Sequence, residues 1–243
     1  MFKDRVAVIT GSARGIGRAI AEALAEQGCN IVISDVNQEG SQKTADEIAA
    51  KYNVKTIGVG ANVTKKEDMT ALANAAVEKL GKLDIWVNNA GVLRDDLLMR
   101  MSEEDWNLVL DVNLKGAFLC TQAALKLMSR QREGHIINIG SYSALSGPAG
   151  QANYAAAKAG MVGLMLSGAA WAEEWKFAIE EIPGSIMDSY AQEFKSRIEA
   201  ATGVDVTVTI YPLGSLGSPT EVAEQTADGV IQLSNLSIGN LGT

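Results

Sequence analysis

The sequence predicts an α/β fold in which a doubly wound parallel sheet forms the middle of three αβα layers. Short apolar runs alternate along the chain with longer segments whose apolar residues recur at helical spacing. The runs are apolar throughout, which is typical of parallel strands covered by helices on both faces. No repeat or linker interrupts the pattern before residue 175, which favours a single domain over residues 1–243.

Three pairs of a strand followed by a helix are expected in the first third of the chain. They lie at residues 5–10 and 16–27, 30–35 and 38–52, and 54–60 and 64–80. Gly28 follows the first helix, as expected of a residue that ends a helix. Thr64 and Glu67 stand three residues apart, and this pattern predicts a capping box at the start of the third helix.

Two further pairs of a strand and a long helix are expected before the pattern changes. They lie at residues 83–91 and 102–129, and at 135–141 and 152–175. Ser102 and Asp105 predict the start of the first of these helices. In a sheet of this kind ligands bind beyond the carboxyl ends of the strands, so the loops that follow the strands are the place to look for a site.

Composition and charge limit the classes of protein to which the chain can belong. A net charge of −8 argues against a nucleic-acid binder, which uses clustered Lys and Arg to neutralise phosphates, and against anionic membranes as partners. The most apolar stretch, residues 161–172, is too short to cross a bilayer. The first residues lack the pattern of a signal peptide. We therefore expect a cytoplasmic protein that binds no membrane and no nucleic acid.

Cysteine and histidine are scarce, which bears on the chemistry available to the protein. Cys29 and Cys120 lie among apolar residues at a spacing that matches no zinc or redox pattern, so we expect free thiols. His135 is the only histidine and begins an expected strand. A single histidine in a strand argues against Ser-His-Asp hydrolysis. It also excludes a metal site built from several histidines, so we expect no metal site.

The stretch TGSARGIG at residues 10–17 places three glycines between an expected strand and an expected helix. The N-terminus of that helix offers unpaired N–H groups and a partial positive charge to a pyrophosphate. Asp35 ends the second strand, about where a carboxylate would accept hydrogen bonds from the ribose hydroxyls of a dinucleotide. A plain turn would also need glycines, but the position of Asp35 favours dinucleotide binding.

Tyr154 and Lys158 stand four residues apart, so they share one face of the expected helix. A free tyrosine has a pKa of about 10, which is high for proton transfer at neutral pH. We expect the neighbouring lysine ammonium to favour the phenolate and lower the pKa of Tyr154. Ser141 ends the fifth strand and can reach the same space. Taken alone, the pair would better fit a tyrosine packed on an Ala-rich helix beside an exposed lysine.

Taken in order, these residues resemble the short-chain dehydrogenase/reductase family. The resemblance covers residues 1 to about 175 and rests on TGSARGIG at 10–17, ANV at 61–63, NNAG at 88–91, Asn113 in DVNLKG, Ser141, Tyr154 and Lys158. Each motif is modestly specific, whereas the ordered set is very specific. The resemblance implies a Rossmann-type fold and an oxidoreductase that uses NAD(P) to interconvert a carbonyl and an alcohol.

The resemblance also implies a role for each residue of the site. Tyr154 would exchange a proton with the carbonyl oxygen, and Ser141 would polarise the carbonyl. Lys158 would hold the nicotinamide ribose and tune Tyr154, and Asn113 would bind a water that links Lys158 to solvent. The implied contacts of the cofactor are Gly11, Ser12, Arg14, Gly15, Ile16, Gly17, Asp35, Asn62, Val63, Asn89, Ala90, Gly91, Tyr154 and Lys158.

The choice between NAD(H) and NADP(H) is a question of charge. Asp35 would accept a hydrogen bond from a ribose 2′-hydroxyl but would oppose a 2′-phosphate, because like charges about 4 Å apart cost roughly 4 kcal/mol at an effective dielectric constant near 20. Arg14 acts in the other direction, since its guanidinium could pair with that phosphate. The carboxylate leads us to expect NAD(H).

Two stretches narrow the substrate that the resemblance implies. Residues 88–106 and 150–160 are similar to family members that reduce 3-oxoacyl thioesters on acyl carrier protein during fatty-acid synthesis, and such members are usually homotetramers. Arg130 and Arg132 are candidates for contact with the acidic carrier. Two alternatives stay open: a dehydrogenase of another small secondary alcohol or ketone, and a relative that binds the cofactor without turnover.

Residues 176–243 depart from the family pattern and form an atypical region on the substrate side. Glu180 and Glu181 fall where an apolar parallel strand is expected, and two buried carboxylates are costly unless they are paired. The last strand is reduced to SIGNLGT at 237–243. A divergent substrate lobe, an inactive relative and a misrecorded stretch of sequence would each account for this departure.

Overall fold

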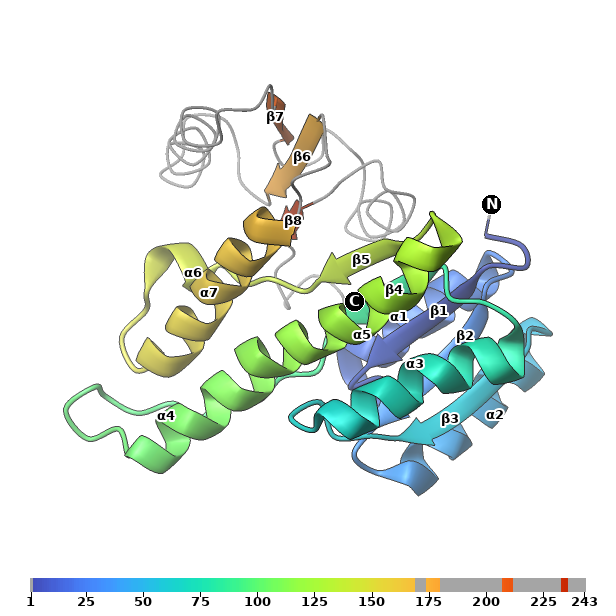
Figure 1. The fold of residues 1–243 in the computed structure, drawn as a ribbon. Coiled ribbons are helices and arrows are strands. Elements are labelled where there is room, and N and C mark those ends of the chain that lie inside the picture. Colours follow the sequence, from blue (N-terminus) through green and yellow to red (C-terminus); the bar gives the residue numbers. More distant parts are fainter. Residues whose placement is uncertain (1, 169–173, 180–206, 212–232, 236–243) are drawn as a thin grey trace.

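The computed structural model describes residues 2–168, 174–179, 207–211 and 233–235. Its centre is a five-stranded parallel sheet in the order β3-β2-β1-β4-β5, with helices on both faces (Figure 1). The predicted α/β class and the three layers are therefore confirmed. The strands are β1 (Val6–Thr10), β2 (Asn30–Asp35), β3 (Thr56–Gly60), β4 (Ile85–Asn88) and β5 (His135–Asn138).

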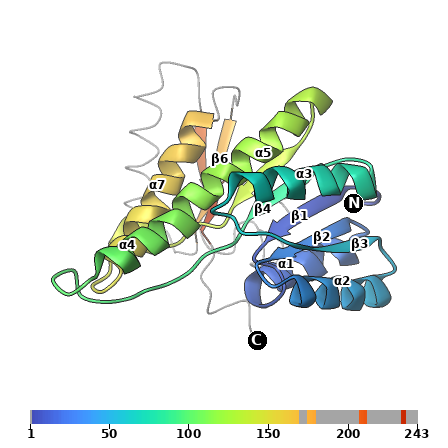
Figure 2. The same cartoon turned by 60° about the horizontal axis from the view of Figure 1, so that its bottom comes forward.

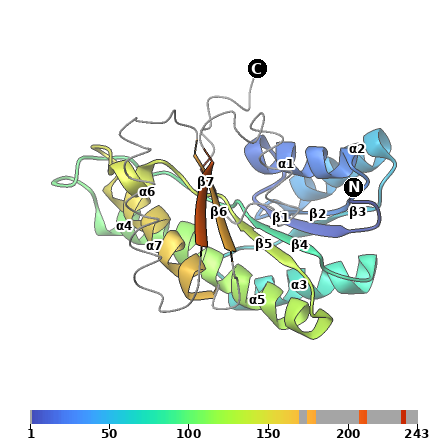
Figure 3. The ribbon, with the colours of Figure 1, turned by 90° about the horizontal axis from the view of Figure 1, so that it is seen from above.

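The helices form two layers because successive residues of each strand point to opposite faces of the sheet. Ala7 and Ile9 of β1 pack in one core cluster with side chains of α1, whereas Val6 and Val8 pack in the other with side chains of α3. Figure 3 shows α1 and α2 on one side of the sheet and α3 and α5 on the other. The helices are α1 (Gly15–Glu26), α2 (Gln38–Tyr52), α3 (Lys66–Leu80), α4 (Glu103–Leu110), α5 (Gly116–Gln131), α6 (Ser143–Ser146) and α7 (Ala152–Gly168).

The two predicted helix starts have different outcomes. The Ser102 hydroxyl accepts a hydrogen bond from the N–H of Asp105 (3.0 Å), so the predicted cap of α4 is confirmed. The capping box at Thr64 is wrong, because the N-cap of α3 is Lys65, whose side chain makes no capping bond. Thr64 instead donates from its hydroxyl to Asn62 Oδ1 (2.9 Å), which closes a local turn before the helix.

The long helix expected after Ser102 contains a π-helical turn, Asp111–Lys115, between α4 and α5. By length and a mean hydropathy of 1.3, the run Glu103–Gln131 could cross a membrane, but a core helix of a globular protein passes the same test. Cys120 and Ala124 of this run are buried in the same core cluster as side chains of α3. Figure 2 shows α5 and α3 side by side along the sheet. The buried apolar residues of the run therefore belong to the core of the fold.

The helix expected over 152–175 is too long, because α7 ends at Gly168 and Glu174 already belongs to a strand. That strand holds Trp175, Phe177 and Ile179, and aromatic and β-branched residues favour strands. It is the centre of a second parallel sheet of order β7-β6-β8. Its strands are β6 (Glu174–Ile179), β7 (Thr207–Tyr211) and β8 (Leu233–Asn235).

Of residues 176–243, the structure describes 176–179, 207–211 and 233–235. Glu180, Glu181 and the stretch 237–243 lie outside the described residues. The prediction that residues 176–243 form an atypical part of one domain therefore stays a prediction. Within the described strands, the hydrogen bonds of the five-stranded sheet end at β5 and β3.

Candidate active site

The glycine loop between β1 and α1 is shaped for close approach of a ligand. Gly11 and Gly15 have φ angles of +64° and +60°, which L side chains adopt with strain. A Cβ atom on Gly11 would lie 2.9 Å from the Cα of Ala90, so the loop packs directly on the segment after β4. No side chain of the described residues caps the first turn of α1. Its N–H groups are therefore available to a phosphate.

Hydrogen bonds lock the glycine loop to the NNAG segment. The Thr10 hydroxyl accepts hydrogen bonds from the backbone N–H groups of Asn89 and Ala90, both at 3.1 Å. The side-chain amide of Asn89 donates to the carbonyls of Thr10 (2.8 Å) and Gly11 (3.1 Å). Two segments almost 80 residues apart therefore form one rigid floor at the carboxyl ends of β1 and β4. The cradle formed by the glycine loop and this floor fits a dinucleotide, since a Cβ on Gly15 would meet nothing within 4 Å and the loop is open there.

The remaining expected cofactor contacts surround this floor. The Ser12 hydroxyl is buried and donates to the carbonyl of Ile9 (2.6 Å), and its N–H donates to the carbonyl of Ser34 (3.0 Å), so both donors are used within the protein. Asp35 is partly exposed at the end of β2 and accepts a hydrogen bond from the N–H of Asn37 (3.3 Å). Val63 is buried, and Asn62, which precedes it, is partly exposed. Arg14 and Gly91 are exposed, and Ile16 is partly exposed.

The structure brings Ser141, Tyr154 and Lys158 together at the carboxyl end of β5. The ammonium of Lys158 lies 5.6 Å from the centre of the Tyr154 ring, so the two side chains share one face of α7 as predicted. The Ser141 hydroxyl lies close enough to Tyr154 to influence the pKa of its phenol. Lys158 is buried, at 3% exposure, and donates to the carbonyl of Ile139 (2.6 Å) directly after β5.

The pKa of Tyr154 differs from the expectation. Burial raises the pKa of Tyr154 above 10.0, the charge of Asp95 raises it further, and the Ser141 hydroxyl lowers it. The predicted lowering of the Tyr154 pKa by Lys158 is therefore wrong for the protein alone, because burial is the largest influence on it and Lys158 directs its ammonium toward the carbonyl of Ile139. Burial also lowers the pKa of Lys158 from 10.5 to about 8. Tyr154 is consequently held in its protonated form.

Asn113 lies in the π-helical turn with its side chain completely buried. Its amide nitrogen donates to the carbonyls of Val92 and Val109, both at 2.9 Å. Its Oδ1 atom is buried without a partner among the described residues, and a Cβ on Gly91 would lie 2.5 Å from it. An orphaned acceptor of this kind fits an ordered water, in line with the water-binding role that the resemblance implied.

Sequence reasoning missed the polar residues whose hydrogen bonds join the segments that carry the site. Asn88 donates to Thr121 (3.0 Å) and Asn138 (2.8 Å), and so joins the ends of β4 and β5 to α5. Gln151 and Asn153, directly before Tyr154, bond to the loop between β4 and α4. The signal was available, since polar residues beside an acid/base residue in an otherwise Ala-rich helix need partners.

Other predictions about single residues have clear outcomes. Cys29 and Cys120 are free and buried, as expected. Burial raises the pKa of both thiols to about 12. His135 begins β5, as expected of a strand residue. Arg130 and Arg132 lie at the end of α5, before the amino end of β5, whereas Tyr154 lies beyond the carboxyl end of that strand.

Fold and site together define a dinucleotide-dependent oxidoreductase, and comparison with known proteins identifies its family. A family model described as short chain dehydrogenase matches residues 5–198. The chain therefore belongs to the short-chain dehydrogenase/reductase family, whose members are NAD(P)-dependent oxidoreductases acting on CH–OH or C=O groups. The match extends beyond residue 175, where the motifs of the resemblance end.

Particular relatives are similar over nearly the whole chain. The 3-oxoacyl-[acyl-carrier-protein] reductase FabG of Vibrio cholerae serotype O1 is 40% identical over 227 residues, covering 93% of this chain and 89% of its own. FabG of Staphylococcus aureus strain Mu50 is 39% identical over 233 residues, covering 93% and 91%. The crystal structure of a short chain dehydrogenase from Mycobacterium avium is 36% identical, with a TM-score of 0.66 over 72% of this chain and 68% of that one.

Replacing Gly17 by Ala is expected to destabilise the protein and weaken cofactor binding. The added Cβ would meet the side-chain amide of Asn89 and would lie 2.6 Å from the Gly11 carbonyl. Overpacking of this kind costs about 1–3 kcal/mol. Gly163→Ala in α7 is the matched control, because nothing lies within 4 Å of its Cβ, and it should stabilise the helix by about 1 kcal/mol. Urea unfolding measures both, and equal stabilities would contradict the packing argument.

Proposed function

We propose that this protein reduces the 3-oxo group of an acyl thioester, carried on acyl carrier protein, to the 3-hydroxyacyl form during fatty-acid synthesis. The main support is the convergence of Ser141, Tyr154 and Lys158 at the carboxyl end of β5. Relatives about 40% identical over most of the chain are named for this reaction. Such a role places the enzyme in the cytoplasm, with a carrier-bound thioester as its partner.

In this mechanism the hydroxyls of Ser141 and Tyr154 donate hydrogen bonds to the substrate carbonyl oxygen. When bound, the reduced nicotinamide supplies the hydride that the carbonyl carbon receives. Tyr154 gives its phenolic proton to the oxygen, so the C=O bond becomes CH–OH and Tyr154 becomes a phenolate. Its raised pKa keeps the proton available, and the charge of Lys158 stabilises the phenolate that forms. A water bound at Asn113 then connects the site to solvent, from which the Tyr154 phenolate regains its proton.

The cofactor that we propose is NADH. The carboxylate of Asp35 stands at the end of β2, and among the residues that the structure describes only the N–H of Asn37 donates to it, so it can accept from a ribose 2′-hydroxyl. Asp35→Ser should remove the repulsion of a 2′-phosphate, and we expect kcat/KM with NADPH to rise about tenfold relative to NADH. Kinetics with both cofactors measure the ratio. An unchanged ratio would show that Arg14 or another residue sets the preference.

We also propose that the chain forms a homotetramer. Three large apolar side chains along the run from α4 to α5 are exposed: Leu108, Phe118 and Leu125. Apolar side chains that share one helical run are typical of a contact between subunits. Arg130 and Arg132 lie at the end of this run, before the start of β5 and away from Tyr154, so we do not propose them as contacts of the carrier. Light scattering of the purified protein determines the number of subunits.

The substrate is tested by following NADH and NADPH oxidation with acetoacetyl-CoA and with simple ketones. A reductase of 3-oxoacyl thioesters should prefer acetoacetyl-CoA in kcat/KM by at least tenfold. Preference for the simple ketones would instead favour a secondary-alcohol dehydrogenase. Cofactor binding without any turnover, in protein whose intact mass agrees with the sequence, would favour a non-catalytic relative and would exclude a misrecorded chain end.

A further inference from the structure

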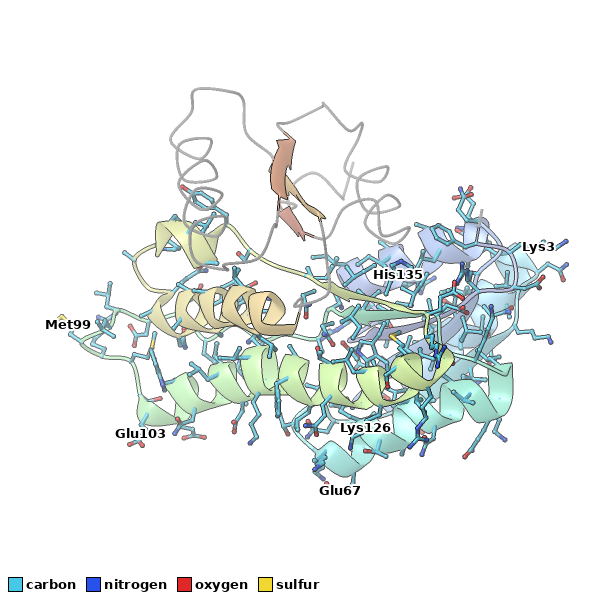
Figure 4. All side chains as sticks on the ribbon, turned by 45° about the horizontal axis from the view of Figure 1, so that its top comes forward. Lys3, Glu67, Met99, Glu103, Lys126 and His135 are labelled. Carbon is cyan, nitrogen blue, oxygen red and sulfur yellow. The ribbon has the colours of Figure 1, made fainter. Side chains whose placement is uncertain are left out.

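The loop between β4 and α4 extends far from the sheet, yet its base is joined to the start of α7 (Figure 4). Its tip carries Met99, which is 89% exposed. Four hydrogen bonds connect residues 94–96 and 105 with residues 150–153, and we call them the latch. They run from Asp96 N to Gly150 O (3.0 Å), from Gln151 Nε2 to Asp95 Oδ2 (3.0 Å), and from Asn153 Nδ2 to Arg94 O (2.9 Å) and Asp105 O (3.4 Å).

Asn153 is the centre of the latch. It is completely buried, and both atoms of its amide are used, since Oδ1 accepts a hydrogen bond from the N–H of Tyr154 (2.7 Å). That N–H lies in the first turn of α7, where no helical carbonyl can accept it. The first bond within the helix runs from Ala155 N to Gln151 O (2.8 Å). One side chain therefore fixes the backbone of Tyr154 and ties it to two distant segments.

We propose that Asn153 is a positioning residue for Tyr154, which it holds in place by fastening the start of α7 to the loop between β4 and α4. The inference rests on the proposed role of Tyr154 as proton donor. A donor must lie within hydrogen-bond reach of the substrate oxygen, and a displacement of about 1 Å can cost about a hundredfold in rate. Asn153 touches neither substrate nor cofactor in this role and acts through the backbone of its neighbour.

The second arm of the latch reaches the other hydroxyl of the site. Gln151 donates to Asp95 and accepts a hydrogen bond from the Ser143 hydroxyl (2.8 Å). The N–H of Ser143 in turn donates to the Ser141 hydroxyl (3.2 Å). The same loop therefore supports both Ser141 and Tyr154. The latch, whose residues include no proposed catalytic group, would therefore set the position of Ser141 relative to Tyr154.

The test compares Asn153→Ala with a matched control, Gln131→Ala. The amide of Gln131 also bridges two segments, because it donates to the carbonyl of Leu83 (2.7 Å) and accepts from its N–H (3.2 Å). It lies before the amino ends of β4 and β5, at the end of these strands opposite to the site. Both variants should lose stability. We expect only Asn153→Ala to lower kcat for acetoacetyl-CoA, by about 10- to 100-fold, with the KM for the cofactor within about twofold of the wild type. Asn153→Ser, which is too short to reach the loop, should behave in the same way and replaces the Ala variant if that does not fold.

A second measurement is independent of turnover. Ionisation of Tyr154 can be followed by ultraviolet difference absorption against Tyr154→Phe. The groups that influence it in the structure are Lys158 on α7, Asp95 in the loop, and the Ser141 hydroxyl. Release of the latch should admit water and lower the pKa of Tyr154 toward its ordinary value. Gln131→Ala should leave this titration unchanged.

The outcomes separate this inference from the proposed function. A folded Asn153→Ala with the kcat and the Tyr154 titration of the wild type would overturn the positioning role. If the wild-type protein does not reduce acetoacetyl-CoA, the proposed substrate is wrong, and the titration of Tyr154 still decides the role of Asn153. Equal losses of kcat in Asn153→Ala and Gln131→Ala would also overturn it, because the effect would then be one of stability alone.

Discussion

Tyr154→Phe is expected to lower kcat by about 10²- to 10⁴-fold, the range typical of the loss of a general acid. The substitution removes one hydroxyl and keeps the ring, which is packed at the start of α7 below Lys158. The cradle of the glycine loop does not involve this hydroxyl, so the dissociation constant of the cofactor should change by less than about threefold. The carbonyl oxygen would keep only the hydrogen bond from Ser141, and no proton donor would replace Tyr154.

Tyr52→Phe is a suitable control for this variant. Its hydroxyl bonds to Glu22 (3.3 Å) at the end of α2, on the helical layer of α1 and α2, so its loss should leave kcat unchanged. Steady-state kinetics with acetoacetyl-CoA and quenching of protein fluorescence by the cofactor give the two quantities. If Tyr154→Phe keeps more than a tenth of the wild-type kcat, the proton comes from another group. Loss of cofactor binding would show instead that the hydroxyl supports the fold of the site.

The order of strands and helices up to β5 was predictable because buried parallel strands are short apolar runs bounded by turns. The second strand and the second helix have the predicted bounds, Asn30–Asp35 and Gln38–Tyr52. Asn37, between them, caps the helix by accepting from the N–H of Gly40 (3.0 Å). Local polar residues and apolar spacing therefore agree in this part of the chain, and such agreement makes a boundary predictable.

Other features depend on contacts that no local pattern records. The π-helical turn at Asn113 moves this side chain into the space between Val92 and Val109, and only the folded loop supplies those carbonyls. The end of α7 was misplaced because alanine, tryptophan and glutamate over 170–175 fit a helix as well as a strand. The tertiary context that places Glu174 in a strand decided between the two.

In the candidate site, too, some features follow from local spacing and others depend on contacts between distant segments. Helical spacing places Tyr154 and Lys158 on one face, and this was predictable. The direction of the Tyr154 pKa was not, because it depends on burial and on Asp95, which comes from a loop about 60 residues earlier in the chain. Spacing along one helix fixes which groups are neighbours there, whereas desolvation depends on every element that covers them.

Lys158→Met is expected to abolish turnover and, at neutral pH, to stabilise the fold. Methionine has a similar length without the charge, and burial has lowered the pKa of Lys158 from 10.5 to about 8. A tenfold change in proton affinity corresponds to about 1.4 kcal/mol, so burying this charge costs about 3 kcal/mol. Loss of the hydrogen bond to Ile139 offsets about 1–2 kcal/mol of the gain. The net stabilisation at pH 7 should be about 1–2 kcal/mol.

The pH dependence of this difference has a definite sign. Unfolded Lys158 keeps its proton up to about pH 10.5, whereas folded Lys158 loses it above about pH 8. Between these values the unfolded state binds more protons, so the contribution of Lys158 to the stability of the wild type rises with pH. The penalty is complete below about pH 8 and absent above about pH 10.5. The advantage of Lys158→Met should therefore shrink across this window.

Urea unfolding at intervals from pH 7 to pH 10 measures this change, and Lys126→Met is the control. Lys126 is an exposed lysine of α5, so its replacement removes a charge that water already solvates, and its effect on stability should not vary across the same window (Figure 4). A wild type that is more stable than Lys158→Met at pH 7 would mean that the ammonium is stabilised by partners in the fold. In that case the charge that supports the Tyr154 phenolate would exist without a cost to stability, and activity and stability would not oppose each other at this position.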